Sequence, residues 1–481
     1  MPATNKPVQE FLQTICDQIR FKSIHRSIIH ELSDHIEEQK NFYMDQGLDE
    51  EAATLKAVEE MGDPVMVGKQ LDKAHRSKTE WSILTLAAVL VLIGGAVQYF
   101  LSGVNENSSY MFSSFLQYAP IGIAAFFLTY FFDYTLLGRF PKFTYIVLFI
   151  LTVAGFFFVR KTNGAYLHVY YSILLFIPAF AGIIYSYRNK GYVGVIACGL
   201  FYIGPATLCV IAPRLSGLIL LSIACLITLT VAILKGIFGG NKNVSLALIY
   251  IPTMMAVMGF GAFIFQSPYR IARIQTVFFP QLDPRGDGWQ LLMIKRILAS
   301  SQFFGEAVLE GNLANMRIDR ILPGWADDLS LTYIIARFGY IAGLIVIFVI
   351  LVLIVRMFIS VNKQRNAYGF LVALSACLAI TGQFVFYVLL NLGFMVLFSV
   401  TLPFISFGGM SFIVNMILLG LILSVYRCTD LVKDKLEVNT NLKSQSSIYH
   451  RRLFSIEDGK LVIDLGVSAY NNMDKNKNDS P

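Results

Sequence analysis

Residues 244–290 read VSLALIYIPTMMAVMGFGAFIFQSPYRIARIQTVFFPQLDPRGDGWQ and contain the transition that decides the fold. The first half is an apolar run, and about 20 such residues suffice for a helix to cross a bilayer. The second half is rich in Arg, Asp, Gly and Pro, and this polar character continues to Leu329. Because the usual connection has only about 4–6 residues, this segment predicts a functional loop between two membrane spans.

The rest of the chain repeats the apolar pattern. Of its 481 residues 55% are hydrophobic and 15% are charged, whereas soluble domains carry roughly 25% charged residues. We therefore expect an all-α polytopic membrane protein with about ten transmembrane helices. The predicted spans are 82–103, 114–136, 143–160, 169–187, 192–212, 215–235, 244–266, 329–356, 367–392 and 403–426.

Positively charged residues predict the topology, because basic loops face the cytoplasm. The basic residues of alternate loops are Arg139, Lys142, Arg188, Lys190, Lys235, Lys242, Arg356, Lys363 and Arg365. Both termini are then cytoplasmic, and the large loop 267–329 between the seventh and eighth spans is extracytoplasmic. The first span would act as an uncleaved signal for the bacterial plasma membrane. This bias accounts for much of the net charge of +7, so no nucleic-acid partner is expected.

Polar sequence flanks the spans on both sides. Residues 1–80 show apolar positions at helical spacing, and predict a small cytoplasmic helical domain. HELSDHIEE at 30–38, GLDEEAA at 47–53 and MGDP at 61–64 resemble the helical prefix domain found before some bacterial permease and sensor proteins. That resemblance implies a regulatory or interaction module. Residues 81–428 are expected to form the transmembrane domain.

The tail, residues 429–481, is expected to be cytoplasmic. Within it Asp458-Gly459 separates two short segments in the manner of a hairpin turn. The composition of residues 471–481 predicts disorder.

Arginines and turn residues dominate the start of the large loop. Arg270 and Arg273 share a helical face and are placed either to grip a phosphate or to snorkel at the membrane interface. Asp283 to Gly288 favours a turn over a calcium loop, because the EF-hand pattern is absent. From Trp289 the sequence predicts a short helix, which would lie in the interface or cap the other helices.

Two adjacent acids, Asp327 and Asp328, follow Leu322-Pro323 at the mouth of the eighth span. Either of them would cap a helix N-terminus well. Of two adjacent carboxylates at a partly dehydrated mouth, one is also expected to have a raised pKa, as a general base working near neutrality requires. Both interpretations remain open at this point.

The order of motifs resembles the SEDS family, the shape, elongation, division and sporulation proteins of FtsW, RodA and SpoVE type, over residues 82–428. The matching motifs are YRIARI at 269–274, FFPQLDPRGDGWQ at 278–290, LPGWADD at 322–328, FG at 338–339, NGA at 163–165, APRLSG at 212–217, GQ at 382–383, Asn391 and LPFISFGGMS at 402–411. This resemblance implies a peptidoglycan glycosyltransferase that polymerises lipid II, a disaccharide-peptide on undecaprenyl pyrophosphate.

The resemblance also implies a site. Asp328 falls on the family's presumed catalytic base, with Asp327 beside it, and a divalent cation (Mg or Mn) would share the work on the pyrophosphate. The implied substrate-binding residues are Arg270, Arg273, Pro280, Asp283, Gly288, Trp289, Gln290, Ser300, Gly305, Pro323, Ser406, Gly408 and Gly409. The implied partners are lipid II, a class B penicillin-binding transpeptidase and other cell-wall, divisome or elongasome proteins.

Several positions depart from the family's pattern. They are Ala326-Asp327 for His-Thr, Ala336-Arg337 for Glu-Glu, Glu306 for Lys, Arg214 for Asp, and Tyr166-Leu167-His168 for Arg-Arg-Trp. These departures support an alternative, a non-catalytic scaffold or regulator of wall synthesis. A flippase for lipid-linked precursors is a third hypothesis. It would require ionisable groups within spans, for which Asp133 is the main candidate.

Overall fold

Four helices precede the first membrane-length helix: α1 (Lys6–Gln18), α2 (His25–Asp45), α3 (Glu50–Glu60) and α4 (Pro64–Ala74). The computed structural model describes residues 6–20, 25–74, 79–104, 108–159, 161, 166–286, 288–313, 316–394, 400–406, 408–429, 454–457 and 460–463. α1 and α4 pack together, as do α2 and α3. Phe11, Ile15, Ile28, Ile36 and Ala57 are buried, as helical periodicity requires, whereas Ile29 is exposed.

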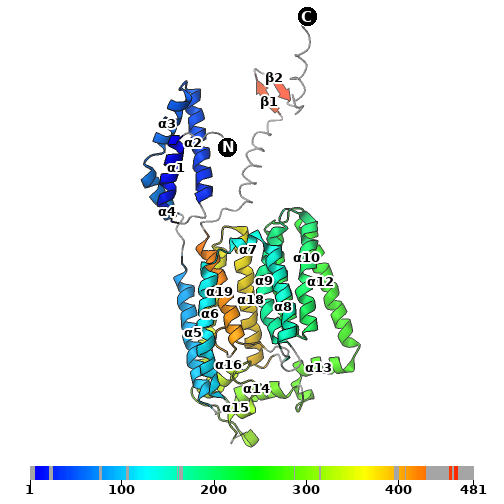
Figure 1. The fold of residues 1–481 in the computed structure, drawn as a ribbon. Coiled ribbons are helices and arrows are strands. Elements are labelled where there is room, and N and C mark those ends of the chain that lie inside the picture. Colours follow the sequence, from blue (N-terminus) through cyan, green and yellow to red (C-terminus); the bar gives the residue numbers. More distant parts are fainter. Residues whose placement is uncertain are drawn as a thin grey trace. The chain divides into compact units, whose positions relative to one another are not determined.

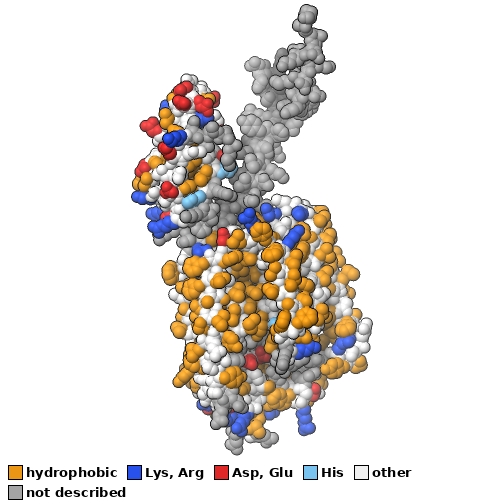
Figure 2. Space-filling view, in the orientation of Figure 1, with side chains coloured by type: hydrophobic (Ala, Val, Ile, Leu, Met, Phe, Trp, Pro, Cys, Tyr) orange, Lys and Arg blue, Asp and Glu red, His pale blue; other side chains and the backbone are white. Residues whose placement is uncertain are grey.

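Among the described residues, ten helices are long and apolar enough to cross a membrane, which confirms the predicted fold class. They are α5 (Trp81–Ser102), α6 (Tyr110–Phe131), α8 (Pro141–Phe158), α9 (Leu167–Ser186), α10 (Gly191–Ile211), α11 (Leu215–Leu234), α12 (Lys242–Phe265), α17 (Tyr340–Asn362), α18 (Ala367–Asn391) and α19 (Gly409–Arg427). They stand side by side as a bundle (Figure 1). Hydrophobic side chains cover its height, and Lys and Arg lie toward its two ends (Figure 2).

The boundaries of three predicted spans were wrong. The eighth span ends at Asn362, not at residue 356, so Arg356 lies within the helix and not in a loop. The eighth span begins at Tyr340, not at residue 329, because Gly339 with φ of 93° ends a separate short helix there. The last span begins at Gly409, not at residue 403. The second ends at Phe131 because Asp133 starts the short helix α7 (Thr135–Arg139) by accepting hydrogen bonds from the Thr135 amide and hydroxyl at 2.9 and 2.7 Å.

The large connection between α12 and α17 is built from short helices. They are α13 (Pro268–Phe278), η3 (Pro280–Leu282), α14 (Trp289–Ala299), η4 (Gly311–Leu313), α15 (Ile318–Ile321) and α16 (Ser330–Phe338). Figure 1 places α13 to α16 at the end of the bundle opposite to the start of α5. We call this the loop end; the connection between α18 and α19 also lies there because the helices alternate in direction.

The core of the bundle lies around α9, α18 and α19, whose residues are the most thoroughly buried. α12 is the opposite case, with Ser245 as its only buried residue among those described. It contacts α10 and α11 and leaves most of its length uncovered. The helices of the core therefore hold the loop end in place, and α12 forms one wall of the bundle's edge.

The chain divides into two compact units, Met1–Val432 and Lys433–Pro481. In the second, β1 (Phe454–Glu457) and β2 (Lys460–Ile463) pair antiparallel, with Phe454 opposite Ile463 and Glu457 opposite Lys460. The predicted disordered stretch 471–481 lies outside the described residues.

Close packing of α6 on α19 yields a first prediction. A Cβ at Gly420 would lie 2.7 Å from the carbonyl oxygen of Phe126 and closer still to the Thr129 hydroxyl, so Gly420→Ala is expected to lower the free energy of unfolding by roughly 1–3 kcal/mol. Gly259→Ala in α12 is the matched control, because a Cβ there meets nothing within 4 Å. Thermal unfolding in detergent measures both. Equal melting temperatures for the two variants would contradict the tight packing.

Candidate functional site

The first turn of α16 is held by side chains of α18. The Tyr387 hydroxyl accepts a hydrogen bond from the Leu331 amide at 2.9 Å, and Asn391 Oδ1 accepts one from the Thr332 amide at 2.9 Å. These amides are donors that a helix cannot satisfy internally. Asn391 Nδ2 donates to the carbonyl oxygen of Asp328 at 2.9 Å. α18 therefore fixes both the start of α16 and the main chain of Asp328.

The two acids lie on the turn that leads into α16. Gly324 adopts a left-handed conformation with φ of 70°, and its carbonyl accepts from the amides of Asp327 at 3.1 Å and Leu329 at 2.9 Å. Pro323 precedes it and is exposed. The helix begins after Leu329, and its first amides pair with α18. Neither acid occupies the N-cap position that the sequence left open for them.

Asp327 and Asp328 differ in their surroundings. The Asp327 side chain is accessible to water but stands in a recess crowded by protein atoms, and this burial together with the charge of Asp328 raises the pKa of Asp327 to about 6. Asp328 is half-buried, and its carboxylate lies within electrostatic range of Tyr170, Tyr171 and Arg214. Asp327 thus has the raised pKa that was expected of one acid in the pair.

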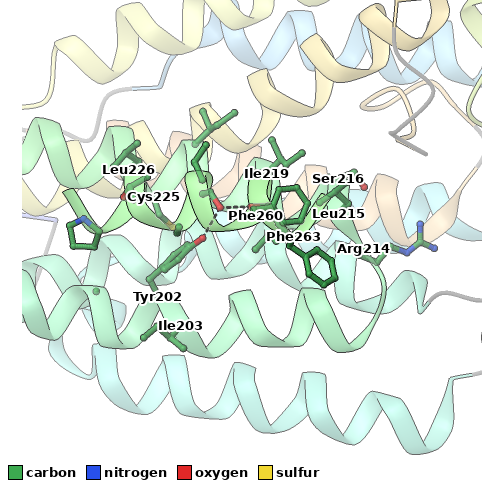
Figure 3. A pocket seen from close by; sticks show the side chains of 18 of the residues that line it. Tyr202, Ile203, Arg214, Leu215, Ser216, Ile219, Cys225, Leu226, Phe260 and Phe263 are labelled. Atoms are coloured by element: carbon green, nitrogen blue, oxygen red, sulfur yellow. Dashed lines mark hydrogen bonds between the residues drawn. The ribbon is translucent and has the colours of Figure 1, made fainter. Parts of the chain in front are cut away.

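A groove of about 1860 Å³ lies between α10, α11, α12 and α13. Its walls are almost entirely apolar, and within them Tyr202 and Ser222 pair with each other at 2.6 Å. Two of its lining residues are cations, Arg214 and Arg270, and Arg214 stands at one end of the row of labelled side chains (Figure 3). Both belong to the loop end, so the groove has an apolar body and a basic head.

Of the two arginines of α13, only Arg270 has a side chain whose contacts are described. The Arg270 guanidinium donates to the carbonyl oxygen of Phe263 at 2.9 Å and stacks over the Phe263 ring at 3.7 Å from its centroid. It lines the groove, but this contact already engages part of its donor set. The side chain of Arg273 lies outside the described residues. A grip formed by the two arginines together remains a prediction.

The segment from Pro280 to Gln290 is a compact turn. Asp283 Oδ1 accepts from the Gly286 amide at 3.0 Å, and the Asp283 carbonyl accepts from Gly288 at 3.1 Å. Only glycine fits at 288, because a Cβ would lie 2.8 Å from the Asp283 carbonyl oxygen and closer to that of buried Pro280. The turn leads to Trp289 and half-buried Gln290 at the start of α14.

α14 behaves as a cap over the bundle. Its residues Leu291, Ile294 and Ile297 are buried, and it packs on α16. Trp289 at its start is 37% exposed. The role of α14 and of the preceding turn in substrate binding remains a prediction.

The loop after α14 pairs with the end of α16. Ser300 closes α14 by donating its hydroxyl to the carbonyl of Arg296 at 3.0 Å. The Gly305 amide donates to Phe338 O at 3.2 Å, and an ion pair joins Glu306 to Arg337. Two departures from the family's pattern thus meet each other in space. The pair borders a second, polar cavity of about 650 Å³.

The motif before α19 reaches the site through one residue. The Ser406 hydroxyl lies 2.9 Å from that of Ser330 and accepts from the Leu402 amide at 3.0 Å. Gly408 precedes α19, and Gly409 packs against the Tyr118 ring of α6. The structure therefore brings Ser406 to the start of α16, whereas the two glycines serve the packing of α19.

Sequence reasoning missed Tyr170, Tyr171, Tyr387 and Thr332. The signal for Tyr387 was available, since it stands four residues before Asn391 and the pair presents polar groups on one face of an apolar span. No comparable pattern distinguished Tyr170 from the other aromatic residues. Arg214 was noted only as a departure from the family's pattern and not as a site residue.

Comparisons with known proteins agree with this fold. The sequence model of the FtsW, RodA and SpoVE family, described as cell cycle proteins, matches residues 77–430. A relative from Trichlorobacter lovleyi, named "Probable peptidoglycan glycosyltransferase FtsW", is 26% identical over 172 residues, which are 36% of this chain and 44% of that protein. A relative of the same name from Buchnera aphidicola subsp. Schizaphis graminum is 31% identical over 208 residues, 42% of this chain and 54% of that protein.

The chain thus aligns with about half the length of these relatives. Among solved structures, it resembles a chain described under "Structural coordination of polymerization and crosslinking by a peptidoglycan synthase complex". The TM-score is 0.59 at 17% identity, and the match covers 74% of this chain and 99% of that chain. At this identity the likeness shows the fold alone.

The pKa of Asp327 predicts a pH dependence of stability. Because its folded-state pKa of about 6 exceeds the ordinary 3.8, the folded protein holds a proton that the unfolded chain releases between these values. Wild-type stability relative to Asp327→Asn should therefore fall as the pH rises from about 4 to about 6, then stay constant. Thermal unfolding of both proteins across this range measures the difference. A difference that does not vary with pH would refute the raised pKa.

Proposed function

Because the chain belongs to the FtsW, RodA and SpoVE family of cell cycle proteins, we propose that it is a peptidoglycan glycosyltransferase that polymerises lipid II. The observation that carries this proposal is the arrangement at the loop end. A half-buried carboxylate, Asp328, stands within electrostatic range of Arg214, which lines the head of a large apolar groove. A substrate with a polar head and a long apolar tail suits this arrangement.

The groove is the proposed binding site for the isoprenoid tail. Its volume of about 1860 Å³ exceeds the roughly 300–1,000 Å³ typical of small-molecule pockets. Apolar walls favour a hydrocarbon chain there, because such a chain takes few hydrogen bonds from polar groups when it displaces water. The tail's diphosphate and sugars would then extend past Arg214 toward Asp328.

Asp328 is the proposed general base. Its carboxylate would take the proton from the 4-hydroxyl of the acceptor sugar, whose oxygen attacks the anomeric carbon of the donor. The bond between that carbon and the phosphate oxygen breaks, and its electron pair leaves with the undecaprenyl pyrophosphate. The hydrogen bond from Asn391 to the Asp328 carbonyl supports this role by fixing the main chain.

The pKa of Asp327, about 6, also lies near neutrality, as a general base prefers, so variants of both acids are compared. The divalent cation implied by the family resemblance stays a prediction. Among the described residues, no group of three His, Cys, Asp or Glu side chains comes together. The proposed cation at the diphosphate is Arg214, which lies within electrostatic range of Asp328, and no proposed step runs through a metal.

The proposed orientation puts the loop end outside the cytoplasm and both termini inside. The distribution of Arg and Lys between alternate loops supports it. We propose a class B penicillin-binding transpeptidase, with other cell-wall, divisome or elongasome proteins, as partners. The resemblance of this fold to a peptidoglycan synthase chain supports that choice.

Reconstitution with lipid II tests the activity. Purified wild type is expected to form glycan chains, and Asp328→Ala to lower the rate by roughly 10²–10⁴-fold, the usual contribution of a general base. Asp327→Ala is the matched control on the same turn, and is expected to keep measurable activity. Thermal unfolding shows whether each variant is folded.

An Asp328→Ala variant that polymerises as fast as wild type would rule out this base. A wild type that makes no glycan, alone or with a transpeptidase that it binds, would instead support the scaffold alternative. The pairing of Glu306 with Arg337 favours the enzyme, because these departures compensate each other in charge.

A further inference from the structure

Arg214 is an unusual residue for its position. Its side chain is 9% exposed, and its Nε is buried with no hydrogen-bond partner in the described part of the chain. No ion pair within 4.0 Å is recorded for its guanidinium among those residues either. Removing a guanidinium from water costs several kcal/mol or so unless an anion or acceptor compensates. The Asp328 carboxylate supplies part of this compensation through space.

A second unpaired group stands beside it. Tyr170 is 2% exposed, and its hydroxyl also has no hydrogen-bond partner among the described residues. The Tyr170 ring faces the start of α11, where a Cβ on Gly217 would lie 3.6 Å from it. Arg214 immediately precedes that helix. Two buried donors therefore converge at a helix N-terminus, where the backbone itself favours an anion.

We propose that Arg214, assisted by the Tyr170 hydroxyl, binds the diphosphate of the lipid-linked substrate at the head of the groove. This rests on the proposed function for the identity of the ligand. The groove supplies the site for the attached isoprenoid, since Arg214, Leu215 and Ser216 line it together with apolar residues of α10 to α12. A diphosphate there is next to Asp328, where a leaving group has to be for the transfer.

Arg214 and Arg270 also differ in how far the protein itself compensates their charge. Arg270 is bonded to the Phe263 carbonyl and stacked on the Phe263 ring, so its charge is partly compensated by the protein. Arg214 has no such contact among the described residues. As the leaving group departs with the electron pair of the broken bond, its new negative charge develops against a guanidinium already in place.

Native mass spectrometry of the detergent-solubilised full-length protein tests this inference. The probes are geranylgeranyl diphosphate and geranylgeraniol, which share a tail and differ in charge. Arg214→Gln is expected to weaken diphosphate binding by about tenfold or more, equivalent to about 1.4 kcal/mol. Binding of the alcohol should change by less than about twofold, because the apolar walls are intact.

Three variants complete the series. Arg214→Lys keeps the charge and should lose less affinity than Arg214→Gln, and Tyr170→Phe should lose roughly threefold for one hydrogen bond. Arg139→Gln, an exposed arginine of α7 away from the loop end, is the matched control and should bind both probes as wild type does. Thermal unfolding without ligand identifies variants that fail to fold.

The outcomes separate this inference from the proposed function. Equal diphosphate affinity of folded Arg214→Gln and wild type would overturn the role of Arg214, whatever the polymerisation assay gives. A wild type that binds the alcohol as tightly as the diphosphate would overturn it as well. Selective, Arg214-dependent diphosphate binding without any glycan formation would support the diphosphate site and contradict the proposed glycosyltransferase activity.

Discussion

The arrangement of the site depends on polar side chains of α18 that satisfy backbone groups inside an apolar bundle. Asn391 uses all of its hydrogen-bonding capacity. Its Nδ2 donates to the carbonyls of Asp328 and Tyr387, and its Oδ1 accepts from the amide and hydroxyl of Thr332. Each such bond contributes only about 0.6 kcal/mol on average in membrane proteins, but together they determine one position for α16. The acids on the preceding turn are positioned through the main chain.

The departures from the family's motifs form contacts of their own. Glu306 and Arg337 are both substantially exposed, so their ion pair contributes about 0–1 kcal/mol. Backbone hydrogen bonds beside them, from Ala307 to Ala336 and from Gly305 to Phe338, hold the two segments together at 2.7 and 3.2 Å. The loop geometry therefore does not depend on which residue carries which charge. The departures at Glu306 and Arg337 are therefore a weak argument against catalytic activity.

Much of the fold followed from the sequence, because apolar runs of bilayer length are a strong signal. The sequence predicted each of the ten spans seen in the described residues, and the errors fell at their ends. Gly339 and Asp133 break helices within polar or mixed sequence, where hydrophobicity gives no boundary. The turn around Gly288 was also predictable from its composition. The surface against which α14 packs was not predictable, since an amphipathic helix fits a membrane surface and a protein surface equally well.

The site was less predictable, because its parts come from distant spans. Asp327 and Asp328 are adjacent in sequence and were easily noticed, whereas Tyr170 reaches them only through the packing of α9 on α11 and α18. Nothing in the residues around Arg214 indicates that its side chain is buried. The sequence shows that Arg214 replaces a residue of opposite charge. Only the structure shows that the guanidinium is buried within electrostatic range of Asp328.

The burial of Arg214 connects the groove to the acid. Its guanidinium is within electrostatic range of Asp328 and at the same time lines the groove. If the groove binds a diphosphate as proposed, the diphosphate and the carboxylate compete for the limited donors of one guanidinium. Linkage requires that this competition be reciprocal. Under the proposed mechanism, the charge state of Asp328 and the occupancy of the groove are therefore coupled through one side chain, and departure of the leaving group returns Arg214 to the acid.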